Sequence, residues 1–212
     1  MAENTQEDIV DVAFRLPGGR LPVDHAYALF GEVSRALPWF ADEAAARLHP
    51  VHTAGPGSGW MPPDESSGGE LHLSRRTRLT VRIPERRAEA AMTLSGRSMD
   101  ISGYPLTPGA AKVVPLVPAG TLLARHVVCE LNEDESRFVP RLAQTLRKHG
   151  VVGATLICGR AHRIVTPDGV IHTRSLVVAN LDPGGALSLM RKGIGPAGKL
   201  GCGIFIPYKR IE

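Results

Sequence analysis

The sequence has few aromatic residues, few cysteines and no long apolar run. Each shortage limits the kinds of partner, compartment or membrane contact that the protein can have. Aromatic residues make up 5% of the chain, so a nucleic-acid partner would find few rings for stacking and would be held mainly through shape and phosphate contacts. The three cysteines form no CxxC pair, which favours a reducing cytoplasm. No apolar run reaches the about 18 residues of a membrane helix. The acidic start, MAENTQED, is unlike a signal peptide, so we expect a cytoplasmic protein without membrane contact.

The composition is that of a globular protein with a mild excess of positive charge. Hydrophobic residues account for 43% and charged residues for 22% of the 212 residues. The formal net charge is +4 and the sequence pI is about 9.2. This balance suits a polyanionic partner without requiring one.

Two successive segments show the same order of predicted elements, strand-helix-strand-strand-helix-strand. Apolar alternation predicts strands, and apolar residues at helical spacing predict helices, with Asp24 as the N-cap of the first helix and Pro38 ending it. In the first segment the strands are predicted over 9–16, 46–53, 70–84 and 97–106, and the helices over 24–38 and 85–95. In the second they are predicted over 121–131, 151–181 as two strands joined by a turn, and 203–209, with helices over 132–150 and 182–193. This predicts an α+β fold of two tandem ferredoxin-like modules, residues 1–110 and 111–212. The segment 107–120 is interpreted as a linker, and 54–69 as a long loop.

A glycine-rich loop lies close to the end of the sequence, in the stretch GIGPAGKLGCGIFIPYK from Gly193 to Lys209. It contains GxGxxG, but a helix precedes it and a strand follows, the reverse of a dinucleotide site. It also contains GxxxxGK, but Leu200 replaces the Ser or Thr that would bind magnesium, so it is not an NTP site. We predict no metal site either, because His49 and His52 would point to opposite faces of a strand and lack further ligands.

The loop can be interpreted in two ways. Glycines let a backbone approach phosphates closely and point its N–H groups at them, and two lysines add positive charge. Under this interpretation the loop clamps a nucleic-acid backbone. The residues involved would be Lys192, Gly193, Gly195, Lys199, Gly201 and Gly203. Alternatively, the glycines only allow tight packing of the last strand.

The tandem modules, together with GIGPAGKLGCGIFIP before the last strand, resemble the RAMP superfamily. The stretch LPVDHAYALFGEVSRALPWF, with a histidine at the start of its helix, is similar to the first helix of the CRISPR-associated endoribonucleases that cut repeat RNA into guide RNAs. The likeness spans residues 9–208. It implies metal-independent cleavage with no cofactor, a product that stays bound, and association with other subunits of a larger effector complex.

RNA cleavage of this kind needs a group that moves a proton. The 2′-hydroxyl is the nucleophile, and the product carries a 2′,3′-cyclic phosphate. Histidine suits the role because its ordinary pKa is ~6.5. His25, beside the helix N-terminus, and His49, where other branches of the family carry their histidine, are the two candidates, with His52 third. Tyr27 or Ser34 is the candidate assisting residue.

Arginine-rich stretches in both segments are candidate RNA contacts. On a strand, Arg76, Arg78 and Arg82 would share a face and could follow one phosphate strand. The further candidates are Arg75 in the first segment and Arg160 and Arg163 in the second. Solvated strand faces are the alternative for many of these side chains.

Three hypotheses follow from the sequence. The first is an endoribonuclease that binds a CRISPR repeat stem-loop and cleaves precursor RNA. The second is a non-catalytic RNA-binding RAMP subunit of an effector complex. The third is a two-module RNA binder with no CRISPR role. Only the first requires a histidine whose loss stops cleavage while binding survives.

Overall fold

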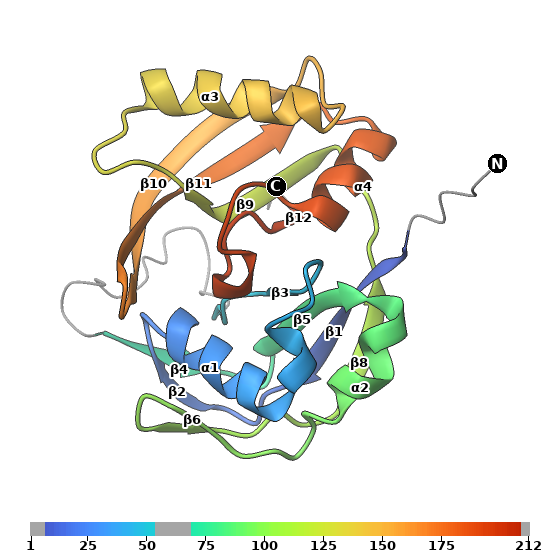
Figure 1. The fold of residues 1–212 in the computed structure, drawn as a ribbon, viewed down its shortest axis with the longest axis vertical. Helices are drawn as coiled ribbons and strands as arrows, with labels where there is room; N and C mark the ends of the chain where they lie inside the picture. The colour runs from blue at the N-terminus through green and yellow to red at the C-terminus, as the bar shows by residue number, and fades with distance from the viewer. Residues whose placement is uncertain (1–6, 54–68, 209–212) are drawn as a thin grey trace. The chain divides into compact units, whose positions relative to one another are not determined.

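The chain divides into two compact units, Met1–Pro115 and Leu116–Glu212 (Figure 1). The structure, a computed structural model, describes residues 7–53 and 69–208. The predicted boundary after residue 110 would detach strand β8 (Ala111–Pro115) from its sheet, because β8 pairs with β1 (Ile9–Arg15). The predicted linker therefore begins with a strand of the first unit. The predicted loop at 54–69 lies, except for Gly69, outside the described residues.

The first unit contains a sheet of four antiparallel strands in the order β3-β5-β1-β8. Helix α1 (Ala26–Ala36) connects β1 to β3 (Arg47–Leu48), and helix α2 (Ala88–Met92) connects β5 (Arg78–Pro84) to β8. This strand order and these crossovers are those of a ferredoxin-like βαββαβ unit, as predicted. Short additions complete the unit: η1 (Pro38–Phe40), η3 (Glu85–Arg87), the pair β2 (Gly19–Pro22) and β4 (Glu70–Leu73), and the hairpin β6 (Met99–Ile101) and β7 (Tyr104–Leu106).

The two faces of strand β1 differ because side chains alternate along a strand. Val12 and Phe14 are fully buried in the core, where Leu29 and Val33 of α1 also lie. The apolar stripe of α1 therefore covers one face of the sheet. Asp11, directly before Val12 in sequence, lies on the other face.

The second unit repeats the arrangement with the antiparallel order β10-β11-β9-β12. Helix α3 (Glu135–Lys148) connects β9 (Thr121–Val128) to β10 (Thr155–Thr166), and helix α4 (Pro183–Lys192) follows β11 (Gly169–Ala179). The one-turn helix η4 (Gly198–Leu200) precedes β12 (Phe205–Pro207). The second unit thus has the connectivity that the sequence pattern predicts. In the first unit the strand predicted over 97–106 instead forms the β6–β7 hairpin, and β8 is the fourth strand of the sheet.

The helices of the second unit begin at side-chain caps. Asp134 accepts a hydrogen bond from the Arg137 N–H at the start of α3, and Asp182 accepts one from the Gly185 N–H at the start of α4. Phe138 and Leu142 place one face of α3 in the core. In the part of the chain that the structure describes, none of the helices has the length and apolar character needed to cross a membrane.

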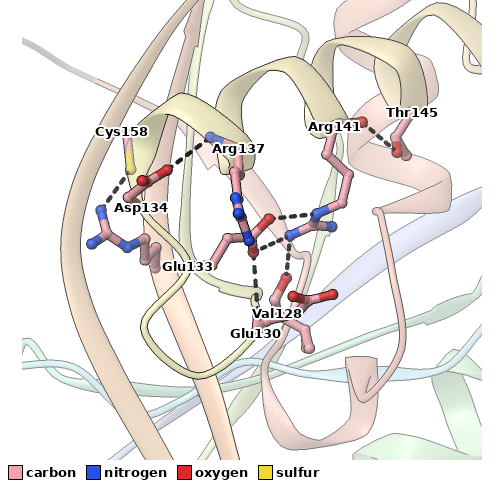
Figure 2. Close-up of polar contacts among 9 residues, drawn as sticks. Val128, Glu130, Glu133, Asp134, Arg137, Arg141, Thr145 and Cys158 are labelled. Carbon is pink, nitrogen blue, oxygen red and sulfur yellow. Dashed lines mark hydrogen bonds and ion pairs between the residues drawn. The ribbon is translucent and has the colours of Figure 1, made fainter.

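A partly buried ion pair joins the loop before α3 to the middle of that helix, next to strand β9 (Figure 2). Arg141 donates to both carboxylate oxygens of Glu133, at 2.8 and 2.7 Å, and also to the Val128 carbonyl. The Glu133 side chain is 3% exposed, whereas that of Arg141 is 43% exposed. The hydrogen bonds from Arg141 hold the pKa of Glu133 below its ordinary value, although burial alone would raise it.

We expect Glu133→Gln to lower the free energy of unfolding by about 1–2 kcal/mol, between the values for exposed and buried ion pairs. Because the folded-state pKa of Glu133 is lowered, its contribution is present above 4.5 and is lost as the pH falls below that value. Urea unfolding of both proteins at neutral and acidic pH measures the difference. The control is Glu130→Gln, an exposed carboxylate in the same loop. Equal stability of the two variants would contradict a stabilising role of the ion pair.

Candidate functional site

His25 lies in the interior of the first unit, directly before helix α1. Its Nδ1 is 3.0 Å from the carbonyl oxygens of both Pro22 and Val23, and its Nε2 is 2.9 Å from the backbone nitrogen of Val51. Carbonyls only accept, so Nδ1 carries the hydrogen and Nε2 accepts from the Val51 N–H. The residue is 4% exposed. Burial, the largest effect, lowers the pKa of His25 below its ordinary value, which keeps the ring neutral at neutral pH.

This environment corrects the expectation for the start of α1 and speaks against a direct catalytic role for His25. His25, not Asp24, occupies the N-cap position, and it makes no side-chain capping bond. Both ring nitrogens are already engaged with backbone groups, so neither is available to a substrate. Through Val51 the ring instead fixes the segment His49–His52, which holds the other candidate histidines.

His49 follows strand β3 and lies beside a carboxylate. Its N–H donates to the Thr80 carbonyl at 3.0 Å, which extends the pairing of β3 with β5. Its Nε2 is 3.5 Å from Oδ1 of Asp11, and the side chain is 15% exposed. His49 is thus held from the backbone side by β5 and from the ring side by β1.

Asp11 is held in turn by a two-point ion pair with Arg82. Nε and Nη2 of Arg82 donate to the two carboxylate oxygens at 2.8 and 2.9 Å. Burial alone would raise the pKa of Asp11, but the contacts with His49 and Arg82 outweigh it and hold this pKa well below its ordinary value. Asp11 therefore stays ionised and can fix the tautomer and orientation of the His49 ring.

The predicted arginine stripe in the first unit is wrong at Arg82. Arg82 is fully buried and paired with Asp11, so it cannot follow a phosphate strand. Arg75 and Arg76 lie in the turn before β5 instead of on a strand, and Arg78 is the first residue of β5. These three side chains are exposed and stay candidate RNA contacts.

The other candidate residues of the first unit lie close to His25 and His49 in sequence but differ in setting. Tyr27 is 42% exposed on α1, and Ser34 is partly buried on the same helix. His52 is partly buried in the segment that His25 holds. Within residues 7–53 and 69–208, no three histidine, cysteine, aspartate or glutamate side chains gather as metal ligands would.

The arginines predicted for the second unit lie on strand β10. Arg160 and Arg163 are exposed, and Arg163 pairs in register with His172 of β11. Nearby, the rings of His126 and His162 meet edge to face with centroids 5.2 Å apart. Nδ1 of His126 is 3.1 Å from the Thr173 hydroxyl. This cluster was not predicted, because its members come from three different strands.

The glycine-rich loop divides into a packed part and an exposed part. Gly203 donates to the His126 carbonyl at 2.6 Å and accepts from the Ile194 N–H, and it is buried with Gly193 and Gly201. Gly195 and Lys192 are exposed, and Lys199 lies in η4. Packing therefore explains the glycines of the first group. The clamp remains a proposal for the exposed part of the loop.

Two substitutions separate these parts of the loop. A Cβ at Gly203 would lie 1.8 Å from the Ile194 carbonyl oxygen, at a φ of +64°. A Cβ at Gly195 would meet nothing within 4 Å, although φ is +68°. We expect Gly203→Ala to lower the free energy of unfolding by about 2–4 kcal/mol, and Gly195→Ala by about 1 kcal/mol. Urea denaturation of both variants measures this. Equal losses would show that packing does not require Gly203.

His25→Ala should lower the free energy of unfolding by about 1–3 kcal/mol, because the buried groups bonded to the ring lose their partner. The lowered pKa of His25 adds a pH signature: below 6.5 protonation favours the unfolded chain, so stability falls as the pH drops. The variant should lack that part of the slope. Urea unfolding between pH 5.5 and 7.5 tests this, with the exposed His72→Ala as control. An unchanged slope would show that His25 does not titrate as the burial requires.

The sequence matches one protein family along nearly its whole length. The family is Cas6, described as Cas6 Crispr, and the match covers residues 10–210. A curated relative, the CRISPR-associated endonuclease Cas6 of Myxococcus xanthus (strain DK1622), is 30% identical over 201 residues. That alignment covers 95% of this chain and 82% of the relative.

Solved structures share the fold at much lower identity. One, a CRISPR-associated protein Cas6, is 11% identical with a TM-score of 0.63, covering 96% of this chain and 100% of the other. Another, a RAMP protein that binds different RNA substrates, is 14% identical with a TM-score of 0.62, covering 93% and 98%. These structures show that the fold is shared. The family match and the 30% identical relative confirm the resemblance seen in the sequence and show that the chain belongs to the Cas6 family.

Proposed function

We propose that the protein is a metal-independent endoribonuclease that binds the stem-loop of a CRISPR repeat and cuts precursor CRISPR RNA into guide RNAs. Membership of the Cas6 family and the likeness to a Cas6 endonuclease support the reaction class. The observation that carries the proposal for this chain is the placement of His49 beside the Asp11 carboxylate. Its ring is the one we assign to proton transfer.

The geometry around His49 suits a general base. The Asp11 carboxylate, 3.5 Å from Nε2, favours the neutral tautomer with its hydrogen on Nε2, which keeps Nδ1 unprotonated and able to accept a proton. The carboxylate stabilises the imidazolium that forms, as an ionised partner does for other catalytic histidines. Arg82 restrains Asp11 by two hydrogen bonds, and His25 restrains the backbone two residues beyond His49. The ring is thus pre-positioned before RNA arrives.

For this reaction the protein has to position the 2′-hydroxyl and the phosphate of the RNA and to remove the proton of that hydroxyl. Nδ1 of His49 removes the proton of the 2′-hydroxyl, whose oxygen attacks the adjacent phosphorus. The bond to the 5′ oxygen breaks, which leaves a 2′,3′-cyclic phosphate and, after protonation, a 5′-hydroxyl. A positioned base of this type contributes about 10²–10⁴-fold to the rate.

RNA binding is assigned to basic side chains in both units. In the first unit these are Arg75, Arg76 and Arg78. In the second unit Arg160 and Arg163 of β10 act with Lys192, Lys199 and the exposed part of the glycine loop. Phosphate contacts of this kind set the position of the RNA and carry little sequence information. We propose that the cut RNA stays bound through them and that the protein joins other subunits of an effector complex.

The decisive experiment is single-turnover cleavage of a cognate repeat RNA in excess EDTA, with binding measured in parallel. We expect wild type to cut and His49→Ala to lose about 10²–10⁴-fold in rate while its RNA affinity is retained. His25→Ala should lose less activity per folded molecule than His49→Ala, since His25 acts on the His49 ring only through the backbone.

His72→Ala is the matched control, because it removes an exposed histidine of the same unit. It should cut at the wild-type rate. Tight binding by wild type with no cut under any condition would overturn the nuclease and leave the non-catalytic RNA-binding subunit. Cleavage only with added divalent metal would overturn metal independence. Full activity of His49→Ala would remove His49 from the reaction.

A further inference from the structure

The first unit holds a pocket that neither His25 nor His49 lines. Its volume is about 860 Å³, within the range of about 300–1,000 Å³ typical of ligand sites. We call it the arginine pocket. Its lining residues are Arg15, Leu16, Pro17, Arg75, Arg78, Ser95, Gly96, Thr107, Pro108, Gly109 and Ala110.

The charge of the arginine pocket is of one sign. Arg15, Arg75 and Arg78 line it, and among the residues that the structure describes no aspartate or glutamate does. Arg15 lies directly opposite Arg78 in the pairing of β1 with β5, and like charges so placed destabilise a sheet. Among residues 7–53 and 69–208, none of these three arginines forms an ion pair. An anionic ligand would remove the repulsion.

Hydrogen bonds hold the Arg78 side chain and the backbone around the other two arginines in place. Nη1 of Arg78 donates to the carbonyls of Arg75 and Thr77, both at 2.8 Å, so one nitrogen of the guanidinium is fixed while the others stay available. The turn is braced by the buried Thr77, whose hydroxyl accepts from the Ser74 N–H. Gly109 donates to the Arg15 carbonyl, which ties the opposite wall to β1. Such a site loses little entropy on binding.

We propose that the arginine pocket binds one phosphate-bearing nucleotide of the RNA, apart from the bond that is cut. This rests on the proposed function in that RNA is the ligand. Guanidinium groups match phosphate oxygens with paired hydrogen bonds, and the hydroxyls of Ser95 and Thr107 can add others. The exposed Pro17 and Ala110 offer apolar surface to the base, and among the described residues no aromatic side chain lines the pocket. Binding here depends on phosphate and is largely indifferent to the base.

The test compares charge removal inside the pocket with charge removal just outside it. The variants are Arg15→Ala with Arg78→Ala, and as control Arg97→Ala, an exposed arginine that follows Gly96 and does not line the pocket. The probe is a repeat RNA whose 2′-hydroxyls are methylated, so that it cannot be cut. We expect the double variant to bind about tenfold or more weakly, and Arg97→Ala to bind as wild type does.

Two further readouts identify the interaction as electrostatic and local. The slope of log affinity against log salt should fall by about 0.7 for each phosphate that the double variant no longer neutralises. The melting temperature without RNA should be unchanged or higher in the double variant, because one repulsive pair is gone. Arg78→Lys, which keeps the charge but not the planar fork of donors, should bind less tightly than wild type. Wild-type affinity or an unchanged salt slope in the double variant would overturn the proposal.

The same variants separate this inference from the nuclease proposal. The double variant should need a higher protein concentration to reach half of its maximal cleavage rate, since the pocket contributes affinity for the RNA. If wild type proves unable to cut, the binding comparison still decides the pocket. Calorimetric titration with a mononucleotide tests whether the pocket binds a free nucleotide instead of RNA. Tight mononucleotide binding, abolished in the double variant while RNA affinity is retained, would overturn RNA as the ligand.

Discussion

The ion pair between Asp11 and Arg82 is the interaction on which the candidate site depends. It joins β1 to β5 on the face of the sheet opposite the helices, between residues that are directly paired in register. Arg82 is fully buried, and losing its partner would leave a buried charge uncompensated. The pair therefore keeps Asp11 ionised. An ionised Asp11 fixes the tautomer of the His49 ring and stabilises the ring when it takes up a proton.

Two histidines of the same unit illustrate how surroundings assign chemical roles. His25 has a backbone partner at each ring nitrogen and is kept neutral by burial, which suits it to hold chain segments together. His49 has a carboxylate partner at one nitrogen, which favours a ring that can take up a proton. The sequence offered the two histidines as alternatives for one role, and we propose a separate role for each. His25 supports the backbone segment from which His49 extends, so each contributes to one arrangement.

Periodicity in the sequence was enough to predict most of the fold. The alternation from Val10 to Phe14 and the repeated element order led to both βαββαβ units, because each reflects a core-facing side. Prolines misled the prediction at β8, where an edge strand tolerates them. The hairpin of β6 and β7 was missed because Ser102 and Gly103, both with positive φ, form a turn inside the stretch predicted as one strand, 97–106. Contacts between residues far apart in sequence could not be predicted. His25 binds Val51 and Asp11 binds Arg82 because of how the strands and loops pack in the fold, and no local sequence pattern specifies that packing.

The register between β1 and β5 explains why the predicted arginine stripe has two roles. One arginine forms an ion pair within the protein, and another is placed to bind an anionic ligand. Along one face of β1 and β5 the paired residues are Asp11 with Arg82, Ala13 with Thr80, and Arg15 with Arg78. The first pair is compensated within the protein and buried, whereas the last sets two permanent cations opposite each other at the mouth of a pocket. Without a ligand, the pairing of Arg15 with Arg78 does not stabilise the sheet. Its repulsion is relieved when an anion enters, so the protein's own stability and its affinity for a phosphate are linked through the same two side chains.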